Sequence, residues 1–165
     1  MAAPHVSAVA ALMLSVNPSL TPAQVRTILQ NTADWKPHMN SNEYGHGRLN
    51  AYSAVKHALP LQLEDHTFTS FSYPPAVTLT GSAHIFGSST AESGLTITIP
   101  TGKVAVLDGS LSRTGSNHAT MVIEGTLIMD EDAVLDGFTI EIGEQGFLLM
   151  RDNTAINGQG GSLAG

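Results

Sequence analysis

Two side chains near the start of the sequence are of the types that carry out acyl transfer. His5 and Ser7 lie two positions apart, and a histidine that accepts the proton of a serine hydroxyl makes that serine a nucleophile. Ser7, however, lacks the glycine-flanked turn that raises a nucleophilic serine above its surroundings. A histidine on an apolar helix is usually a hydrogen-bonded core residue. We therefore predict that neither residue is catalytic.

Metal-binding side chains are present, but their spacing does not fit a metal site. The sequence has no cysteine, and no histidine pair has the spacing of a zinc motif. Asp130, Glu131, Asp132 and Asp136 offer carboxylates, but they do not match a calcium-binding loop. We predict no metal site in this chain, a solvated acidic turn at 130–136, and solvated loop positions for the other histidines, which are His38, His46, His57, His66, His84 and His118.

Charge divides the sequence into two parts. Residues 1–60 contain four basic and two acidic residues, whereas residues 61–165 contain three basic and twelve acidic residues. Such a shift predicts a domain boundary near residue 60. The acidic second part repels phosphate and is therefore not expected to bind nucleic acid. No apolar run approaches the length of about 18 residues that a membrane span needs.

The first part has the start and stop signals of helices. Residues 2–16 are apolar or small on nearly all sides, which predicts a helix that is buried all round. Thr21, Pro22 and Gln24 form a capping-box pattern at the start of a second, amphipathic helix. Residues 34–43 are typical of a loop, and Asn50 is a suitable cap for a last helix that ends before Pro60.

Three of these stretches occur in the order found in one protease family. They are the hexapeptide Met1-Ala2-Ala3-Pro4-His5-Val6, the helix initiated by Pro22, and a signature that comprises Gly45, Gly47, Leu49, Asn50 and Ala51. Residues 1–59 resemble the C-terminal end of the catalytic domain of subtilisin-like serine proteases, the subtilase family. In that family Gly-Thr-Ser precedes the hexapeptide motif, and its serine is the nucleophile.

The resemblance implies where the chemistry of such a protein lies. The nucleophile would immediately precede Met1, and the triad acid, the triad histidine and the oxyanion asparagine would also lie upstream. Met1, Ala2, Ala3, Pro4 and His5 would be adjacent to the active site, with His5 in a structural role. The chain would then contain no catalytic residue and no cofactor and would be inactive alone. Its parent would be a secreted or cell-surface bacterial endopeptidase that acts on proteins or peptides, with calcium possible in that parent.

The second part has the alternating pattern of β-strands. Val77-Thr78-Leu79-Thr80 is one such run, and it ends at Gly81. A short motif of two apolar residues, an acidic residue and glycine begins at Val106, Val122 and Val134, at uneven intervals. This pattern favours a β-solenoid, with a β-sandwich as the alternative. Overall we expect an α+β chain, in which the helical end of an α/β subtilisin-like domain (1–60) precedes an acidic all-β accessory module (61–165), itself truncated.

Three functions remain open at this point. The first is a fragment of a secreted subtilisin-like endopeptidase, the second is a β-solenoid binding or adhesion module with a degenerate protease remnant, and the third is an inactive pseudoprotease. Residues 61–165 could contact a surface or a polysaccharide. Tyr73 and several phenylalanines would suit a sugar platform, but aromatic residues make up only 5% of the chain, and core packing explains them better.

Overall fold

The computed structural model describes residues 3–158 and divides the chain into two compact units that part between Pro60 and Leu61. We call residues 3–60 the helical unit and residues 61–158 the solenoid, and we describe each by itself. None of the helices in residues 3–158 combines the length and the apolar character that crossing a membrane requires.

The helical unit contains four helices: α1 (Ala3–Val16), α2 (Pro22–Asn31), α3 (Ser41–Tyr44) and α4 (Ala51–Ala58). The capping box that the sequence predicts at Thr21 is confirmed, since its hydroxyl accepts from the Gln24 N–H and its own N–H donates to the Gln24 side chain. The prediction of a loop over 34–43 misses α3. That single turn forms because the Asn40 side chain accepts the N–H of Glu43 and caps it.

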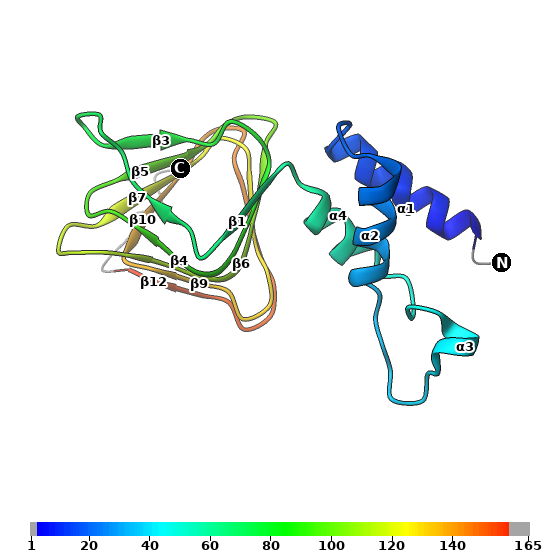
Figure 1. Cartoon of the computed structure of the whole chain (residues 1–165). Helices are drawn as coiled ribbons and strands as arrows, with labels where there is room; N and C mark the ends of the chain where they lie inside the picture. The colour runs from blue at the N-terminus through cyan, green and yellow to red at the C-terminus, as the bar shows by residue number, and fades with distance from the viewer. Residues whose placement is uncertain (1–2, 159–165) are drawn as a thin grey trace. The chain divides into compact units, whose positions relative to one another are not determined.

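The core of the helical unit is small. Val9 and Met13 of α1 are buried with Ala54 and Ala58 of α4, and both α1 and α2 pack on α4 (Figure 1). The prediction that α1 is buried all round is wrong for this structure. Three of its large apolar side chains are 40–52% exposed, namely Val6, Leu12 and Leu14, because the described part of the chain provides nothing that covers both sides of the helix.

The exposed apolar side chains of α1 lead to a prediction about self-association. Leu12 and Leu14 lie two positions apart and so face different sides of the helix, and each leaves apolar surface in water that promotes contact between molecules. The full chain is therefore expected to associate at micromolar concentration. Replacing Leu12 and Leu14 with glutamate should shift it toward monomer in sedimentation velocity. Leu149→Glu is the control, because Leu149 is also exposed (55%) but lies in the solenoid. An unchanged distribution in the α1 variant would show that this helix is not the contact.

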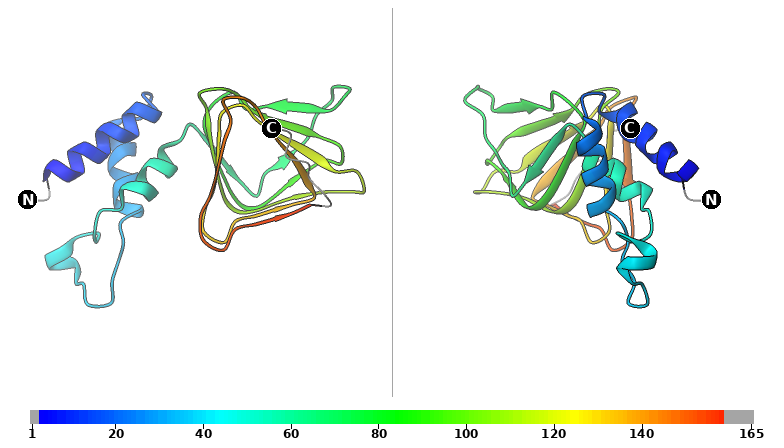
Figure 2. Two further views of the ribbon diagram at one scale, coloured as in Figure 1. Left: turned by 180° about the vertical axis from the view of Figure 1, so that it is seen from behind. Right: turned by 45° about the vertical axis from the view of Figure 1, so that its right-hand side comes forward.

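The solenoid consists of twelve strands, and all of its ladders are parallel. The strands are β1 (Leu61–Glu64), β2 (Thr67–Phe68), β3 (Ala76–Thr78), β4 (Ala83–Ala91), β5 (Thr96–Ile99), β6 (Val104–Arg113), β7 (Ala119–Ile123), β8 (Thr126–Met129), β9 (Val134–Asp136), β10 (Phe138–Ile142), β11 (Phe147–Met150) and β12 (Ala155–Asn157). Each coil runs along three sides in turn, so the unit has a three-sided cross-section (Figures 1 and 2). The β-sandwich alternative is thereby excluded, since it needs antiparallel sheets.

Inward-facing residues form ladders that run from coil to coil. One ladder joins Leu63, Ile85, Leu107, Met129 and Met150 through the pairs β1·β4, β4·β6, β6·β8 and β8·β11. Its three middle members are at most 1% exposed. The burial of such ladders, one apolar side chain on the next, supplies the hydrophobic stabilisation of the solenoid.

The spacing of the true repeat differs from the one read in the sequence. Ala83 pairs with Ala105, and Ala105 in turn pairs with Leu127, so these two steps from coil to coil have the same length. The acidic-glycine motif recurs at shorter and uneven intervals and therefore does not mark successive coils. It marks three different bends: Asp108-Gly109 lies within β6, Glu124-Gly125 joins β7 to β8, and Asp136-Gly137 joins β9 to β10.

Candidate functional site

The hexapeptide motif lies at the N-terminal end of α1. Ala3, Pro4 and His5 occupy its first turn, while Met1 and Ala2 lie outside the described residues. The Ser7 hydroxyl donates to the Pro4 carbonyl at 3.0 Å, which is a local helix contact. His5 is exposed, so the expectation that it is a core histidine is not met in this structure. The first turn presents backbone N–H groups and the positive end of the helix dipole.

The glycine signature forms a clasp between the α2–α3 connection and the start of α4. Asp34 and Arg48 are joined by an isolated antiparallel bridge, in which the N–H of each donates to the carbonyl of the other at 2.8 and 2.9 Å. Gly47 lies directly beside this bridge, with a φ of +115°. A Cβ at Gly47 would lie 2.5 Å from the Asp34 carbonyl oxygen. Any larger residue at this position would therefore push the two segments joined by the Asp34–Arg48 bridge apart.

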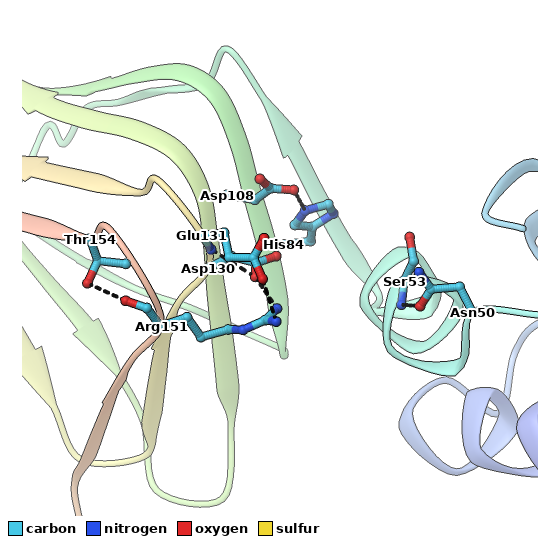
Figure 3. A network of polar contacts seen from close by, with 8 residues as sticks. All are labelled: Asn50, Ser53, His84, Asp108, Asp130, Glu131, Arg151 and Thr154. Carbon is cyan, nitrogen blue, oxygen red and sulfur yellow. Dashed lines mark hydrogen bonds and ion pairs between the residues drawn. The ribbon is translucent and has the colours of Figure 1, made fainter. Parts of the chain in front are cut away.

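The side chains of the clasp are also joined. The Asp34 carboxylate accepts from the Arg48 guanidinium at 2.7 Å and from the Asn50 amide at 2.9 Å. The hydrogen bonds from Arg48 and then from Asn50 lower the pKa of Asp34 below its ordinary value. The oxygen of the Asn50 side chain accepts the Ser53 N–H and caps α4 (Figure 3). Asn50 therefore links the clasp to the helix.

The three remaining members of the signature complete this join. Gly45 ends α3, and its N–H donates to the Ser41 carbonyl at 3.1 Å. Leu49 packs against the small core of the helical unit, and Ala51 is the first residue of α4. Every contact of the signature thus fixes backbone or fills the core, and none of them prepares a nucleophile. This is a structural element that holds the end of the helical unit together.

The clasp makes the helical unit sensitive to acid. Because the pKa of Asp34 is lowered in the folded state, its contribution to stability is present above the unfolded value of about 3.9 and is lost as the pH falls through the lower, folded value. We expect the urea midpoint of the fluorescence of Trp35, the single tryptophan, to fall below about pH 4.

The matched controls for this prediction are two amide variants. Asp34→Asn should lower the midpoint at neutral pH and remove much of the decline in acid. Glu43→Gln removes the only other carboxylate side chain of the helical unit and should leave the decline in place. Equal pH profiles for the wild-type chain and Asp34→Asn would contradict the role assigned to this carboxylate.

The acidic residues at 130–136 are not simply a solvated turn. The side chain of Asp130 is only 7% exposed and accepts from Arg151 at 2.6 Å, while Glu131 accepts from the same guanidinium at 2.8 Å (Figure 3). Arg151 follows β11, one coil further on, so this ion pair joins two coils. Within residues 3–158 no three acidic or histidine side chains are grouped closely enough to hold a metal ion.

Two other sequence-based expectations are corrected in the solenoid. His84 is not a solvated loop residue, since it lies in β4, is 1% exposed and contacts Gln62 and Asp108. Tyr73 is not a core residue, since it is 99% exposed, and Phe71 beside it is fully exposed as well. Phe71 is not among the residues that the sequence motifs point to. The signal that could have pointed to it is the alternation of serine with aromatic residues over 70–73, followed by two prolines.

Comparison with known proteins adds to this geometry. Residues 1–47 match the model of the subtilase family. The chain is 39% identical to an extracellular protease of Xanthomonas campestris over 103 residues, which is 62% of this chain and 17% of that protein. It is 47% identical to bacillopeptidase F of Bacillus subtilis over 60 residues, 33% of this chain and 4% of the relative. It is 41% identical to the calcium-dependent protease of Trichormus variabilis over 71 residues, 38% of this chain and 11% of the relative.

The class of protein to which these matches relate the chain is the serine proteases. Within that class, residues 1–47 are similar to the subtilase family, and the helical unit is followed by a β-rich extension that folds as a solenoid. The chain spans less than a fifth of the length of the curated relatives that it matches. The match to the Xanthomonas protein covers more residues than the helical unit contains and so extends into the solenoid. No solved structure matches the chain significantly.

Proposed function

We propose that the helical unit is the C-terminal end of a subtilisin-like catalytic domain and that the solenoid is an accessory domain of the same secreted serine endopeptidase. The observation that carries the proposal is the combination of the subtilase match over 1–47 with the uncovered α1. An apolar helix with both sides exposed is incomplete by itself. The sheet of a catalytic domain would bury the side chains that this structure leaves exposed.

The proposed active site lies at the N-terminal end of α1. A serine immediately before Met1 would attack the carbonyl carbon of the peptide bond, and an upstream histidine would accept the proton of its hydroxyl. The backbone N–H groups and dipole of α1 favour the negative charge that develops on the carbonyl oxygen. This chain thus contributes the support of the nucleophile and part of the electrostatics. Calcium in the parent and secretion are parts of the same proposal, supported by the names of the calcium-dependent and extracellular relatives.

The proposal is tested by the DNA upstream of the Met1 codon and by two proteins made from it. We expect an in-frame Gly-Thr-Ser, casein hydrolysis by the protein extended to include it, and loss of at least about 1,000-fold of the kcat when that serine is replaced by alanine. The 165-residue chain should not hydrolyse casein. An in-frame stop codon directly upstream, or hydrolysis by the chain alone, would refute the proposal.

A further inference from the structure

The connection between β2 and β3 exposes two aromatic side chains. Phe71 and Tyr73 are 107% and 99% exposed, about as exposed as in an unfolded chain. No other large apolar side chain of residues 3–158 exceeds 67%. Leaving an aromatic ring in water forgoes the favourable free energy of its burial, so two such rings on one short loop indicate a surface that binds something.

The loop that carries these rings is held in place by its serines. The Ser70 hydroxyl donates to the Ala76 carbonyl at 3.0 Å, and the Ser72 hydroxyl accepts the Ala76 N–H at 3.3 Å. The Ser72 hydroxyl also donates to the Pro74 carbonyl at 3.1 Å. The serines are therefore turned toward the start of β3, while the aromatic residues that alternate with them face solvent.

These hydrogen bonds hold the loop, and with it the two aromatic side chains, in position before any ligand binds. The Ser70 N–H donates to the Glu92 carboxylate at 3.2 Å, which ties the loop to the next coil. Because the backbone around Phe71 and Tyr73 is already ordered, binding would lose little conformational entropy. An unstructured loop with the same residues would have to order itself first.

The loop that carries the rings has no charged residue of its own and is rich in hydroxyls, and the Glu92 carboxylate of the next coil is held by the Ser70 N–H. Residues 67–83 contain no aspartate, glutamate, lysine, arginine or histidine, but they contain four threonines and three serines. With twelve acidic against three basic residues in 61–165, the solenoid repels polyanions such as nucleic acids and anionic lipids. The complementary ligand is uncharged, has an apolar face for the rings and has hydroxyl groups at its edge.

We propose that Phe71 and Tyr73 form a binding platform for a neutral polysaccharide. The C–H groups on the face of a pyranose ring carry partial positive charge and match the negative face of an aromatic ring. The sugar hydroxyls stay hydrated at the edge of the platform, so no charge has to be desolvated. Two neighbouring rings suit a chain of sugars, because each ring can stack on a different residue of one polymer.

The test is retention of the full chain on three insoluble neutral polysaccharides: microcrystalline cellulose, chitin and starch. We expect saturable binding to at least one of them, and binding at least about tenfold weaker for Phe71→Ala/Tyr73→Ala. Tyr73→Phe retains the ring and should bind within about twofold of the wild-type chain. Phe147→Ala removes another exposed ring of the solenoid (67% exposed) and should also bind like the wild-type chain.

Several outcomes would overturn the proposal. One is no retention on any of the three polysaccharides, and another is equal retention of the double variant and the wild-type chain. A third is binding to phosphatidylcholine vesicles that requires both rings while the polysaccharides are not bound, since this would assign the rings to a lipid surface. Because both side chains are exposed, the double variant should melt like the wild-type chain. If it does not, the single variants Phe71→Ala and Tyr73→Ala, each compared with Tyr73→Phe, decide the question.

Discussion

Replacing Gly109 with alanine is expected to lower the free energy of unfolding of the solenoid by about 3 kcal/mol or more. Gly109 lies at the bend within β6, has a φ of +122° and pairs with Gly87 of the preceding coil. A Cβ at Gly109 would lie 2.4 Å from the Gly87 carbonyl oxygen. Since that contact is with backbone, two coils would have to move apart to relieve it.

The matched control for this prediction is Gly102→Ala. Gly102 also has a positive φ, +74°, but a Cβ there would meet nothing within 4 Å. Gly102→Ala should therefore lower the free energy of unfolding only by the strain of a left-handed backbone at a residue with a Cβ, about 1–2 kcal/mol. Urea unfolding followed by far-UV circular dichroism in the β-sheet band reports the solenoid, and Trp35 fluorescence reports the helical unit, so the two transitions can be separated. Similar losses for the two variants would show that the close approach of the coils is not what requires glycine at 109.

Replacing Leu107 with alanine is expected to cost about 3 kcal/mol of solenoid stability. Leu107 is 1% exposed and lies between Ile85 and Met129 in the inward ladder. Removing three carbons there loses burial and leaves a cavity that the neighbouring coils cannot fill without breaking their ladders. The urea midpoint of the circular dichroism signal should fall, while that of Trp35 fluorescence should not.

Two controls distinguish the effect of losing buried atoms from the effect of shortening any apolar side chain. Leu149→Ala removes the same atoms from a side chain that is 55% exposed, and Met150→Ala shortens the last described member of the same ladder, which is 44% exposed. Both should cost less than about 1 kcal/mol. A loss for Leu149→Ala as large as that for Leu107→Ala would mean that the ladder is not the core of the solenoid.

The local signals of the helical unit could be predicted from sequence because each of them is short-range. Thr21 and Gln24 satisfy each other's backbone N–H groups within one turn, and Asn50 caps α4 through Ser53, three positions away. Such contacts need no knowledge of the rest of the fold. The turn of α3 was missed because a single-turn helix depends on one cap and has no apolar period.

Two of the site-related errors concern residues whose surroundings come from distant parts of the chain. Asp130 is buried and pairs with Arg151, one coil further on, and His84 is buried in β4 rather than solvated. The clasp at Asp34 joins residues that lie 14 and 16 positions apart. No composition or alternation pattern reports such partners.

The sequence by itself determined the helix starts at Thr21 and Asn50, the resemblance of the first part to the subtilase family and the β-strand character of the second part. Only the tertiary structure decided that α1 is left uncovered, that one coil spans the interval from Ala83 to Ala105 and that Phe71 and Tyr73 face solvent. The reason is physical. Helix caps and strand alternation arise from neighbours along the chain. Burial and exposure depend instead on which coil lies beside a residue, and the ladders that place the coils join positions far apart in the sequence.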